Sequence, residues 1–199
     1  MADYVLVHGG KSNGIVWNKV IPLLEEMGHR VFAPSLASPE GSTLSEHISG
    51  VCKSIEENNL DGIILAGHSY ASFVITGVAD RMPERIKRLI YIDSSVPAPG
   101  KSLSEIFADS GIGFEDYGVP QDPPFLEPLD YDEEKLRKIP KTYIQCTQSE
   151  FAIVSRPTYE KVVENAERDN WDYFTLDSDH KCMDSHPVEL ADLLLLKRD

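Results

Sequence analysis

The feature that most constrains the fold is a regular alternation between short apolar runs and segments with helical spacing. Most of the runs are continuous rather than alternating with polar residues, which predicts strands covered on both faces. Strands that alternate with helices predict an α/β fold: a mostly parallel sheet of roughly six strands with helices on both faces. The runs cover residues 4–7, 31–33, 62–66, 89–92, 142–146 and 173–176, and the helical spacing falls within residues 16–27, 44–55, 73–82 and 188–194.

One stretch departs from the alternation of strands and helices. Residues 96–138 are rich in proline, glycine and acidic residues. About 40 residues with two short helices, expected around 103–107 and 133–138, are too few for a second domain. We expect this stretch to be an insertion that lies over one edge of the sheet as a small cap.

The chain carries a formal net charge of −14, from 19 lysines and arginines against 33 aspartates and glutamates. This charge repels nucleic-acid backbones and anionic membrane surfaces, so we expect neither as a partner. A helix needs about 20 apolar residues to span a bilayer, and no apolar run approaches that length. The chain enters an apolar strand directly, without the basic segment of a secretory signal, which favours a cytoplasmic protein.

The cysteines Cys52, Cys146 and Cys182 are too few and too scattered for a disulfide framework or a paired-cysteine metal site. Their odd number suits a reducing compartment. We expect all three to be small residues in or near the core. The sequence predicts neither a metal nor a cofactor.

The strongest chemical signal is the segment Gly62-Ile-Ile-Leu-Ala-Gly-His-Ser-Tyr-Ala-Ser72, an apolar strand that runs into the pattern G-x-S-x-A and then into a helix. In a nucleophile elbow the serine sits on a sharp turn, so the residues two positions to either side must be small. Gly67 and Ala71 meet that requirement around Ser69. Ser69 is the predicted nucleophile, and the N–H of Tyr70, in the first turn of the helix, can face an oxyanion.

A second signal is the strand end Tyr4-Val-Leu-Val-His-Gly-Gly10. Small residues here let the backbone turn under a reacting carbonyl and offer a second N–H, that of Gly10, to the same oxyanion. His8 is expected to be structural. A phosphate-binding loop ending at Gly10-Lys-Ser12 is the competing interpretation, but the glycine it requires five residues earlier is Val5.

The general base has to be a histidine that follows the serine, because in this class of fold the acid and then the histidine come later in the chain. That order leaves His180 and His186. His180 lies in a polar loop four residues past the last predicted strand, whereas His186 precedes Pro187 and is expected to begin the final helix. We predict that His180 is the base.

The acid is expected at the end of the preceding strand, where Glu150 is the carboxylate within reach. Its task is to accept the histidine Nδ1–H and to stabilise the imidazolium that forms. Asp93, which ends the strand before that, is the alternative acid. Asp177 and Asp179 are nearer to His180 in sequence but are expected to shape its loop.

Matches to a known family are spread over nearly the whole chain: Tyr4-Val-Leu-Val-His-Gly-Gly10, Trp17, Pro22-Leu-Leu-Glu-Glu-Met-Gly-His-Arg-Val31, Leu65-Ala-Gly-His-Ser-Tyr70, Leu89-Ile-Tyr-Ile-Asp93 and Asp179-His180 ahead of a leucine-rich helix. In these segments the sequence resembles the α/β-hydrolases, in the branch of plant methylesterases, hydroxynitrile lyases and small bacterial esterases. The resemblance implies one α/β-hydrolase domain over residues 1–199 with the cap at about 96–138. It also implies Ser69 as nucleophile, His180 as base, and Gly10 with Tyr70 as the oxyanion donors.

The chain departs from that family in three places. The family acid is usually an aspartate in a Cys-Thr-x-Asp-like turn, and here Ser149 occupies that position with Glu150 one residue later. The cap is much shorter than in the plant enzymes, so their pocket residues do not transfer. Lys181 resembles the lysine that follows the histidine in the lyases and helps to handle cyanide there. Gly9, however, replaces the threonine whose hydroxyl the lyases use.

The leading hypothesis is a serine hydrolase that cleaves a small carboxylic ester through an acyl-enzyme intermediate. The first alternative is a hydroxynitrile lyase-like carbon–carbon lyase, which Lys181 suggests. The second is a non-catalytic small-molecule binder on the same fold, which the irregular acid suggests, because a fold does not fix a function.

Overall fold

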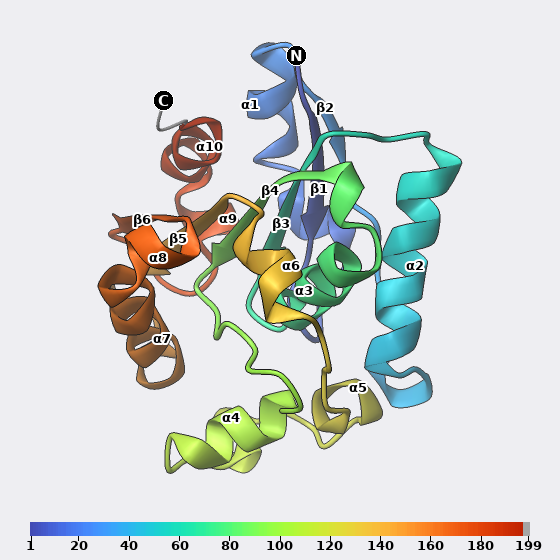
Figure 1. Ribbon diagram of the computed structural model, residues 1–199. Helices are drawn as coiled ribbons and strands as arrows, with labels where there is room; N and C mark the ends of the chain where they lie inside the picture. The colour runs from blue at the N-terminus through green and yellow to red at the C-terminus, as the bar shows by residue number, and fades with distance from the viewer. Residues whose placement is uncertain (197–199) are drawn as a thin grey trace.

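Six strands form one parallel sheet in the computed structural model, which describes residues 1–196 (Figure 1). The order across the sheet is β2-β1-β3-β4-β5-β6, and every neighbouring pair runs parallel. The predicted parallel sheet of roughly six strands is confirmed. The strands are β1 (Asp3–Val7), β2 (Arg30–Phe32), β3 (Ile63–His68), β4 (Ile86–Ile92), β5 (Lys141–Cys146) and β6 (Trp171–Leu176).

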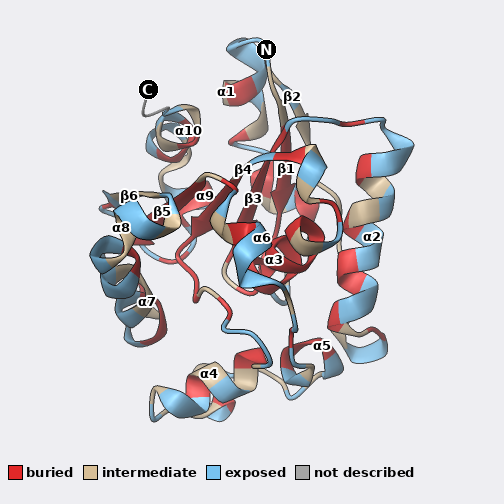
Figure 2. Cartoon of the chain, in the orientation of Figure 1, coloured by how far each residue is buried: buried red, intermediate tan, exposed pale blue. Residues whose placement is uncertain are grey.

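Helices cover both faces of the sheet, and the period-two alternation of each strand divides the core into two layers. Leu65 and Tyr91 belong to the first layer, whereas their neighbours Ala66 and Ile92 belong to the second. Figure 2 shows the strands buried at the centre and the outward faces of the helices exposed. The first layer contains α2 (Leu44–Glu57), α3 (Ala71–Arg81) and α7 (Ala152–Glu164), and the second contains η1 (Gly14–Trp17), α1 (Ile21–Glu26), α9 (Cys182–Ser185) and α10 (Pro187–Leu195).

The ends of these helices follow from local sequence. Thr43 begins α2 with a capping box, in which its hydroxyl accepts from the Glu46 N–H at 3.2 Å and the Glu46 carboxylate accepts from the Thr43 N–H at 2.7 Å. The helix expected within residues 16–27 is divided in two, because Pro22 lacks the N–H needed to continue a helix but suits a first turn. The remaining short helices of the main body are η2 (Pro39–Gly41), η3 (Pro83–Arg85) and α8 (Ala166–Asp169).

Residues 96–138, which we call the cap, contain four short helices. Its α4 and α5 lie at the end of the molecule opposite the N-terminus (Figure 1). At its base, the Gly100 N–H donates to the Leu129 carbonyl at 2.9 Å, and the Leu129 N–H donates to the Lys101 carbonyl at 3.1 Å. We call this pair of bonds the clasp. The helices are α4 (Leu103–Asp109), η4 (Phe114–Tyr117), α5 (Pro123–Leu126) and α6 (Glu133–Arg137).

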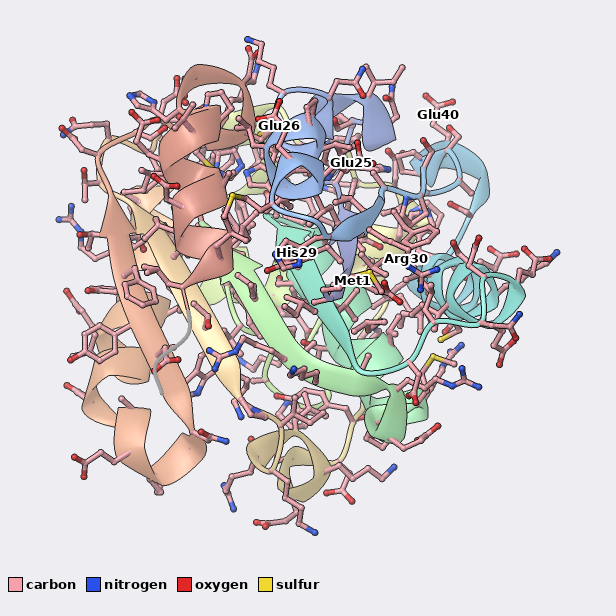
Figure 3. The ribbon with its side chains drawn as sticks, turned by 90° about the horizontal axis from the view of Figure 1, so that it is seen from above. Met1, Glu25, Glu26, His29, Arg30 and Glu40 are labelled. Atoms are coloured by element: carbon pink, nitrogen blue, oxygen red, sulfur yellow. The ribbon has the colours of Figure 1, made fainter. Side chains whose placement is uncertain are left out.

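The amino end of the sheet carries polar side chains. His29 Nδ1 accepts from the Ala2 N–H at 3.2 Å, and the Arg30 guanidinium pairs with Asp3 at 2.7 Å. Figure 3 shows His29 and Arg30 beside Met1 at this end. His29 therefore lies away from the carboxyl ends of the strands, where the parallel sheet gathers its functional residues.

The three cysteines are free thiols, with Cys146 and Cys182 buried and Cys52 half-buried, as predicted. Over residues 1–196, no helix combines the length and the apolar character that a membrane crossing requires.

Candidate functional site

Ser69 occupies the turn between β3 and α3 and has a left-handed backbone, with φ at 55°. This conformation costs an ordinary residue about 1–2 kcal/mol, so the neighbouring structure has to hold it. The Ser69 N–H donates to the Ile92 carbonyl at 3.0 Å, and its carbonyl accepts from the Ser72 N–H at 3.0 Å. A Cβ on Gly67 would lie 2.8 Å from the Ala71 carbonyl oxygen. The close approach of strand and helix thus requires glycine here, as in the predicted elbow.

His180 lies in the loop between β6 and α9, and its side chain is almost wholly buried. Its Nδ1 lies 2.6 Å from Oδ2 of Asp93, the residue directly after β4. Because a carboxylate accepts, Nδ1 carries the proton and Nε2 is left as the basic nitrogen. The backbone of Asp93 is also left-handed, with φ at 41°. The structure therefore brings the predicted base together with the alternative acid.

Glu150 does not make the contact predicted for it. Its side chain is exposed, and the Nδ1 of His180 is occupied by Asp93. The turn after β5 directs the preceding residue inward instead, so that the buried Ser149 hydroxyl donates to Asp93. The expectation that Glu150 accepts the histidine N–H is wrong, because in this turn the side chain that faces the core belongs to Ser149.

The Asp93 carboxylate is fully buried and well supplied with donors. Gln145 Nε2 donates to its Oδ1 at 3.0 Å, while His180 and Ser149 donate as well. Burial alone would raise the pKa of Asp93, but the hydrogen bond and charge of His180, followed by the Ser149 hydroxyl, outweigh it and hold the pKa below its ordinary value. Asp93 is thus a carboxylate at neutral pH, ready to stabilise an imidazolium.

A second histidine, His68, supports the loop of the first. Its Nε2 donates to the His180 carbonyl at 2.8 Å, and the two rings lie 4.4 Å apart. Burial, followed by the nearby His180 ring, holds the pKa of His68 well below its ordinary range. His68 is therefore neutral and ties the end of β3 to the loop after β6. Sequence reasoning missed this hydrogen bond, because it depends on two distant segments meeting in the folded chain.

The two predicted oxyanion donors lie side by side. A Cβ on Gly10 would be 3.8 Å from the Cβ of Tyr70, and one on Gly9 would be 3.2 Å from the Cβ of Ser69. Between residues 1 and 196, neither the Gly10 N–H nor the Tyr70 N–H has a hydrogen-bond partner. Both are available to an oxygen bound beside Ser69.

His8 is structural, as predicted. Its Nδ1 donates to the Gly9 carbonyl at 2.8 Å, and its Nε2 accepts from the Leu36 N–H at 2.9 Å. Both ring nitrogens are therefore occupied. Burial lowers the pKa of His8, which keeps the ring neutral in this arrangement.

Ser69, His180 and both oxyanion donors line a cavity of about 640 Å³. No hydrogen bond joins the Ser69 hydroxyl to His180 in the described chain, and such bonds often tighten only when a substrate is bound. Side chains of the cap also line the cavity. Aromatic rings from three cap residues and from the start of α7 contribute to its wall: Phe107, Tyr117, Phe125 and Phe151.

Phe151 is a wall residue that sequence reasoning missed. Its ring lies 4.3 Å from the His180 ring and stacks on Tyr117 at 4.9 Å. Phe114 of the cap does not line the cavity and packs against Phe107 at a ring distance of 5.0 Å.

The remaining candidates occupy supporting positions. His186 immediately precedes α10, as predicted, and Lys181 is exposed at the edge of the cavity. Asp177 accepts from Thr147 at 3.0 Å, and Asp179 accepts from the Lys181 N–H at 3.0 Å, so both shape the loop around His180 as expected. Among residues 1–196 there is no group of three metal-ligating side chains.

Comparison with known proteins gives a consistent picture. A sequence profile described as the alpha/beta hydrolase fold matches residues 5–179. The carbendazim-hydrolyzing esterase of Nocardioides sp. (strain SG-4G) is 43% identical over 111 residues, which are 52% of this chain and 46% of that protein. The alpha-hydroxynitrile lyase of Arabidopsis thaliana is 33% identical over 105 residues, 47% of this chain and 40% of that protein. The chain thus matches less than half the length of these two relatives.

Among solved structures, an extracellular alpha/beta-hydrolase from a Paenibacillus species superposes with a TM-score of 0.80. The alignment covers 100% of both chains at 22% sequence identity. This likeness establishes the fold.

Proposed function

The chain belongs to the alpha/beta hydrolase fold family, and on that premise we propose that it is a serine hydrolase that cleaves a small carboxylic ester through an acyl-enzyme intermediate. The observation that carries the proposal is the arrangement of Ser69, His180 and Asp93 around one cavity, with the Nδ1 of His180 held 2.6 Å from Asp93. Two unpartnered N–H groups beside Ser69 complete the chemistry that acyl transfer needs.

In the proposed reaction, the Ser69 oxygen forms a bond to the ester carbonyl carbon while its proton passes to His180 Nε2. The carbonyl oxygen becomes an oxyanion that accepts hydrogen bonds from the N–H groups of Gly10 and Tyr70. Asp93 stabilises the imidazolium. The tetrahedral intermediate then collapses, the bond to the alcohol oxygen breaks, and His180 returns its proton to the departing alcohol.

Deacylation repeats these steps with water in the place of Ser69. His180 takes a proton from the water as its oxygen bonds to the acyl carbon, the same two N–H groups hold the second oxyanion, and the Ser69 oxygen leaves with the proton returned by His180. The carboxylic acid is released and the enzyme is regenerated. Each oxyanion donor is expected to contribute about 100- to 1,000-fold to the rate.

The two alternatives have less support. Lys181 is near the cavity, as a lyase would require, but Gly9 offers no hydroxyl beside it. A non-catalytic binder has no need for a buried carboxylate that fixes the histidine tautomer, and Asp93 supplies one. Esterases among the relatives, such as the carbendazim-hydrolyzing enzyme, favour hydrolysis over the lyase reaction.

A reducing compartment such as the cytoplasm is part of the proposal. Cys146 and Cys182 are buried thiols whose side chains hydrogen-bond to each other without forming a disulfide. Such thiols persist where the surroundings are reducing. Cell fractionation with an antibody against the protein tests this point, and recovery from the culture medium would contradict it.

The proposed activity is tested by initial rates on p-nitrophenyl esters from acetyl to octanoyl, with Ser69→Ala in parallel. We expect turnover that Ser69→Ala removes, and a fluorophosphonate probe that labels the peptide containing Ser69 in the mass spectrum. Turnover no greater than that of Ser69→Ala on every ester would contradict the proposal. Cyanide release from a cyanohydrin, measured in the same preparations, would then favour the lyase.

A further inference from the structure

A buried hydrogen bond ties Tyr70 to the middle of the fold. The Tyr70 hydroxyl lies 2.8 Å from Nδ1 of His47 on α2, and the two rings meet edge to face at 5.8 Å. Each residue is 3% exposed. His47 Nε2 lies 2.7 Å from the Ser42 hydroxyl, which itself donates to the Ser38 carbonyl, and 3.1 Å from the Ala37 carbonyl oxygen. Both oxygens therefore accept from Nε2, which carries the proton. Nδ1 is therefore the acceptor, and the Tyr70 hydroxyl is the donor.

The position of Tyr70 matters because its own N–H is one of the two proposed oxyanion donors. The direction of that N–H depends on the peptide plane between Ser69 and Tyr70. Ser69 is in the costly left-handed conformation, with φ at 55°, so the peptide stays in place only if the flanking residues are fixed. The ring of Tyr70 contacts both His47 and Phe125 of the cap, the latter edge to face at 4.8 Å.

We propose that His47 is a positioning residue: it holds the Tyr70 side chain, and through it the Tyr70 N–H, in the geometry that binds the oxyanion. The proposal rests on the serine-hydrolase function inferred above. His47 does not line the cavity. Its influence passes through one hydrogen bond and one residue to the reacting oxygen.

The same bond also stabilises the fold, so a loss of stability in a variant does not by itself support the proposal. Removing the acceptor leaves a buried hydroxyl unpaired, which typically costs about 1–3 kcal/mol. A positioning role has a further consequence that stability does not have. Loss of a positioning hydrogen bond weakens binding of the transition state while leaving binding of the ground state nearly unchanged.

Three single variants and one double variant separate these effects. His47→Phe keeps a ring but removes the acceptor, Tyr70→Phe removes the donor, and His47→Gln offers a carbonyl to Tyr70 and an N–H to Ala37. We expect kcat of His47→Phe and of Tyr70→Phe to fall by about 10- to 100-fold, as for a displaced catalytic group, with KM changed less than about threefold. His47→Gln regains most of the loss. His47→Phe combined with Tyr70→Phe costs no more than either change alone, because both remove the same bond.

A second readout follows the oxyanion site directly. An aryl trifluoromethyl ketone adds to a serine and presents an oxyanion to the same donors, so its affinity for His47→Phe should fall by the same factor as kcat/KM. Labelling with a fluorophosphonate gives the fraction of folded sites and corrects both quantities. Tyr91→Phe is the matched control: it removes a buried tyrosine bond to Thr76 of α3, 2.9 Å long, and should lower the Tm while kcat stays within twofold.

Wild-type kcat and ketone affinity per labelled site in both His47→Phe and Tyr70→Phe would overturn the proposal. A loss of kcat in the Tyr91→Phe control as large as in His47→Phe would overturn it too, because stability alone would then explain the effect. If His47→Phe does not fold, Tyr70→Phe and His47→Gln decide the matter. Absence of any Ser69-dependent turnover in the wild type would instead reject the proposed function itself.

Discussion

Asp93 and His180 meet at 2.6 Å although 87 positions separate them in the chain and strand β5 lies between the strands that lead to them. The contact is possible because the carboxyl ends of parallel strands gather at one edge of the sheet. Between the two, the turn after β5 contributes Ser149 as a donor to the Asp93 carboxylate. The acid that we propose for this site therefore directly follows β4, and the neighbouring turn supports it.

Replacing the acid tests that relationship. Asp93→Asn should lower kcat by about 1,000- to 10,000-fold, because an amide N–H facing Nδ1 forces the wrong tautomer on His180. Glu150→Gln should stay within about twofold, since the Glu150 side chain is exposed and does not contact Nδ1. Initial rates on the best p-nitrophenyl ester measure both. The reverse order of the two losses would restore Glu150 as the acid.

A carboxylate introduced into the turn after β5 should be able to replace Asp93 as the acid. The Ser149 hydroxyl already reaches the Asp93 carboxylate, so a carboxylate at position 149 lies near the His180 imidazole. We expect Asp93→Asn combined with Ser149→Asp to recover at least about tenfold of the activity lost in Asp93→Asn. Ser149→Ala in the Asp93→Asn background is the control, and equal rates for the two double variants would refute the expectation.

Gly67 should tolerate no side chain. A Cβ there would lie 2.8 Å from the Ala71 carbonyl oxygen, so the strand or the helix has to move. Gly67→Ala should lower the free energy of unfolding by about 1–3 kcal/mol, as overpacking does, and should reduce the fraction of sites that a fluorophosphonate labels. Gly50→Ala, on α2 with nothing within 4 Å of its added Cβ, should instead stabilise by about 0.5–1 kcal/mol. Urea unfolding curves compare the two.

Lys141 gives the protein a pH dependence unrelated to catalysis. Burial lowers its pKa from 10.5 to about 8, while its ammonium donates to the carbonyls of Leu136 and Ile139 at 2.8 and 2.9 Å. The unfolded chain binds more protons than the folded chain between these two pKa values. Stability from this residue therefore rises with pH across that window.

The free energy of unfolding of the wild type relative to Lys141→Met should consequently increase by up to about 3 kcal/mol between pH 7 and pH 10.5, at 1.36 kcal/mol per pKa unit. Groups common to both proteins cancel in the difference. Urea titrations at four pH values measure it. A difference that stays flat, or that falls with pH, would show that the ammonium is not penalised by burial.

Local pattern predicted the strands and the elbow because each depends on neighbours in the chain, whereas His180 was selected by its place after the serine in chain order. The apolar run before Ser69 and the small residues around it specify a strand, a turn and a helix without reference to the rest of the fold. The acid could not be predicted from local pattern. Choosing between Glu150 and Asp93 requires knowing which side chain of the turn after β5 points inward, and a single residue of offset exchanges Ser149 for Glu150.

Helix α7 shows the same limit in secondary structure. Its buried residues Val154 and Val162 are accompanied by exposed Ile153 and Val163, so no clear apolar stripe marks it, and Pro157 lies inside it. Packing against β5 and β6 supplies the stabilisation that the local sequence lacks. Phe151, just before this helix, was missed for the same reason.

The clasp between Lys101 and Leu129 has an evolutionary consequence. It closes the segment between these residues at its base, so the segment is anchored independently of its own length and sequence. Doubling such a loop costs only about 0.6 kcal/mol in closure free energy. Insertions, deletions or wholesale grafts between the two anchor points can therefore diversify what enters the cavity while the strand ends that hold Ser69 and Asp93 stay untouched. The architecture thus separates a variable cap segment, which determines the substrate, from the constant strand ends that hold the reacting side chains.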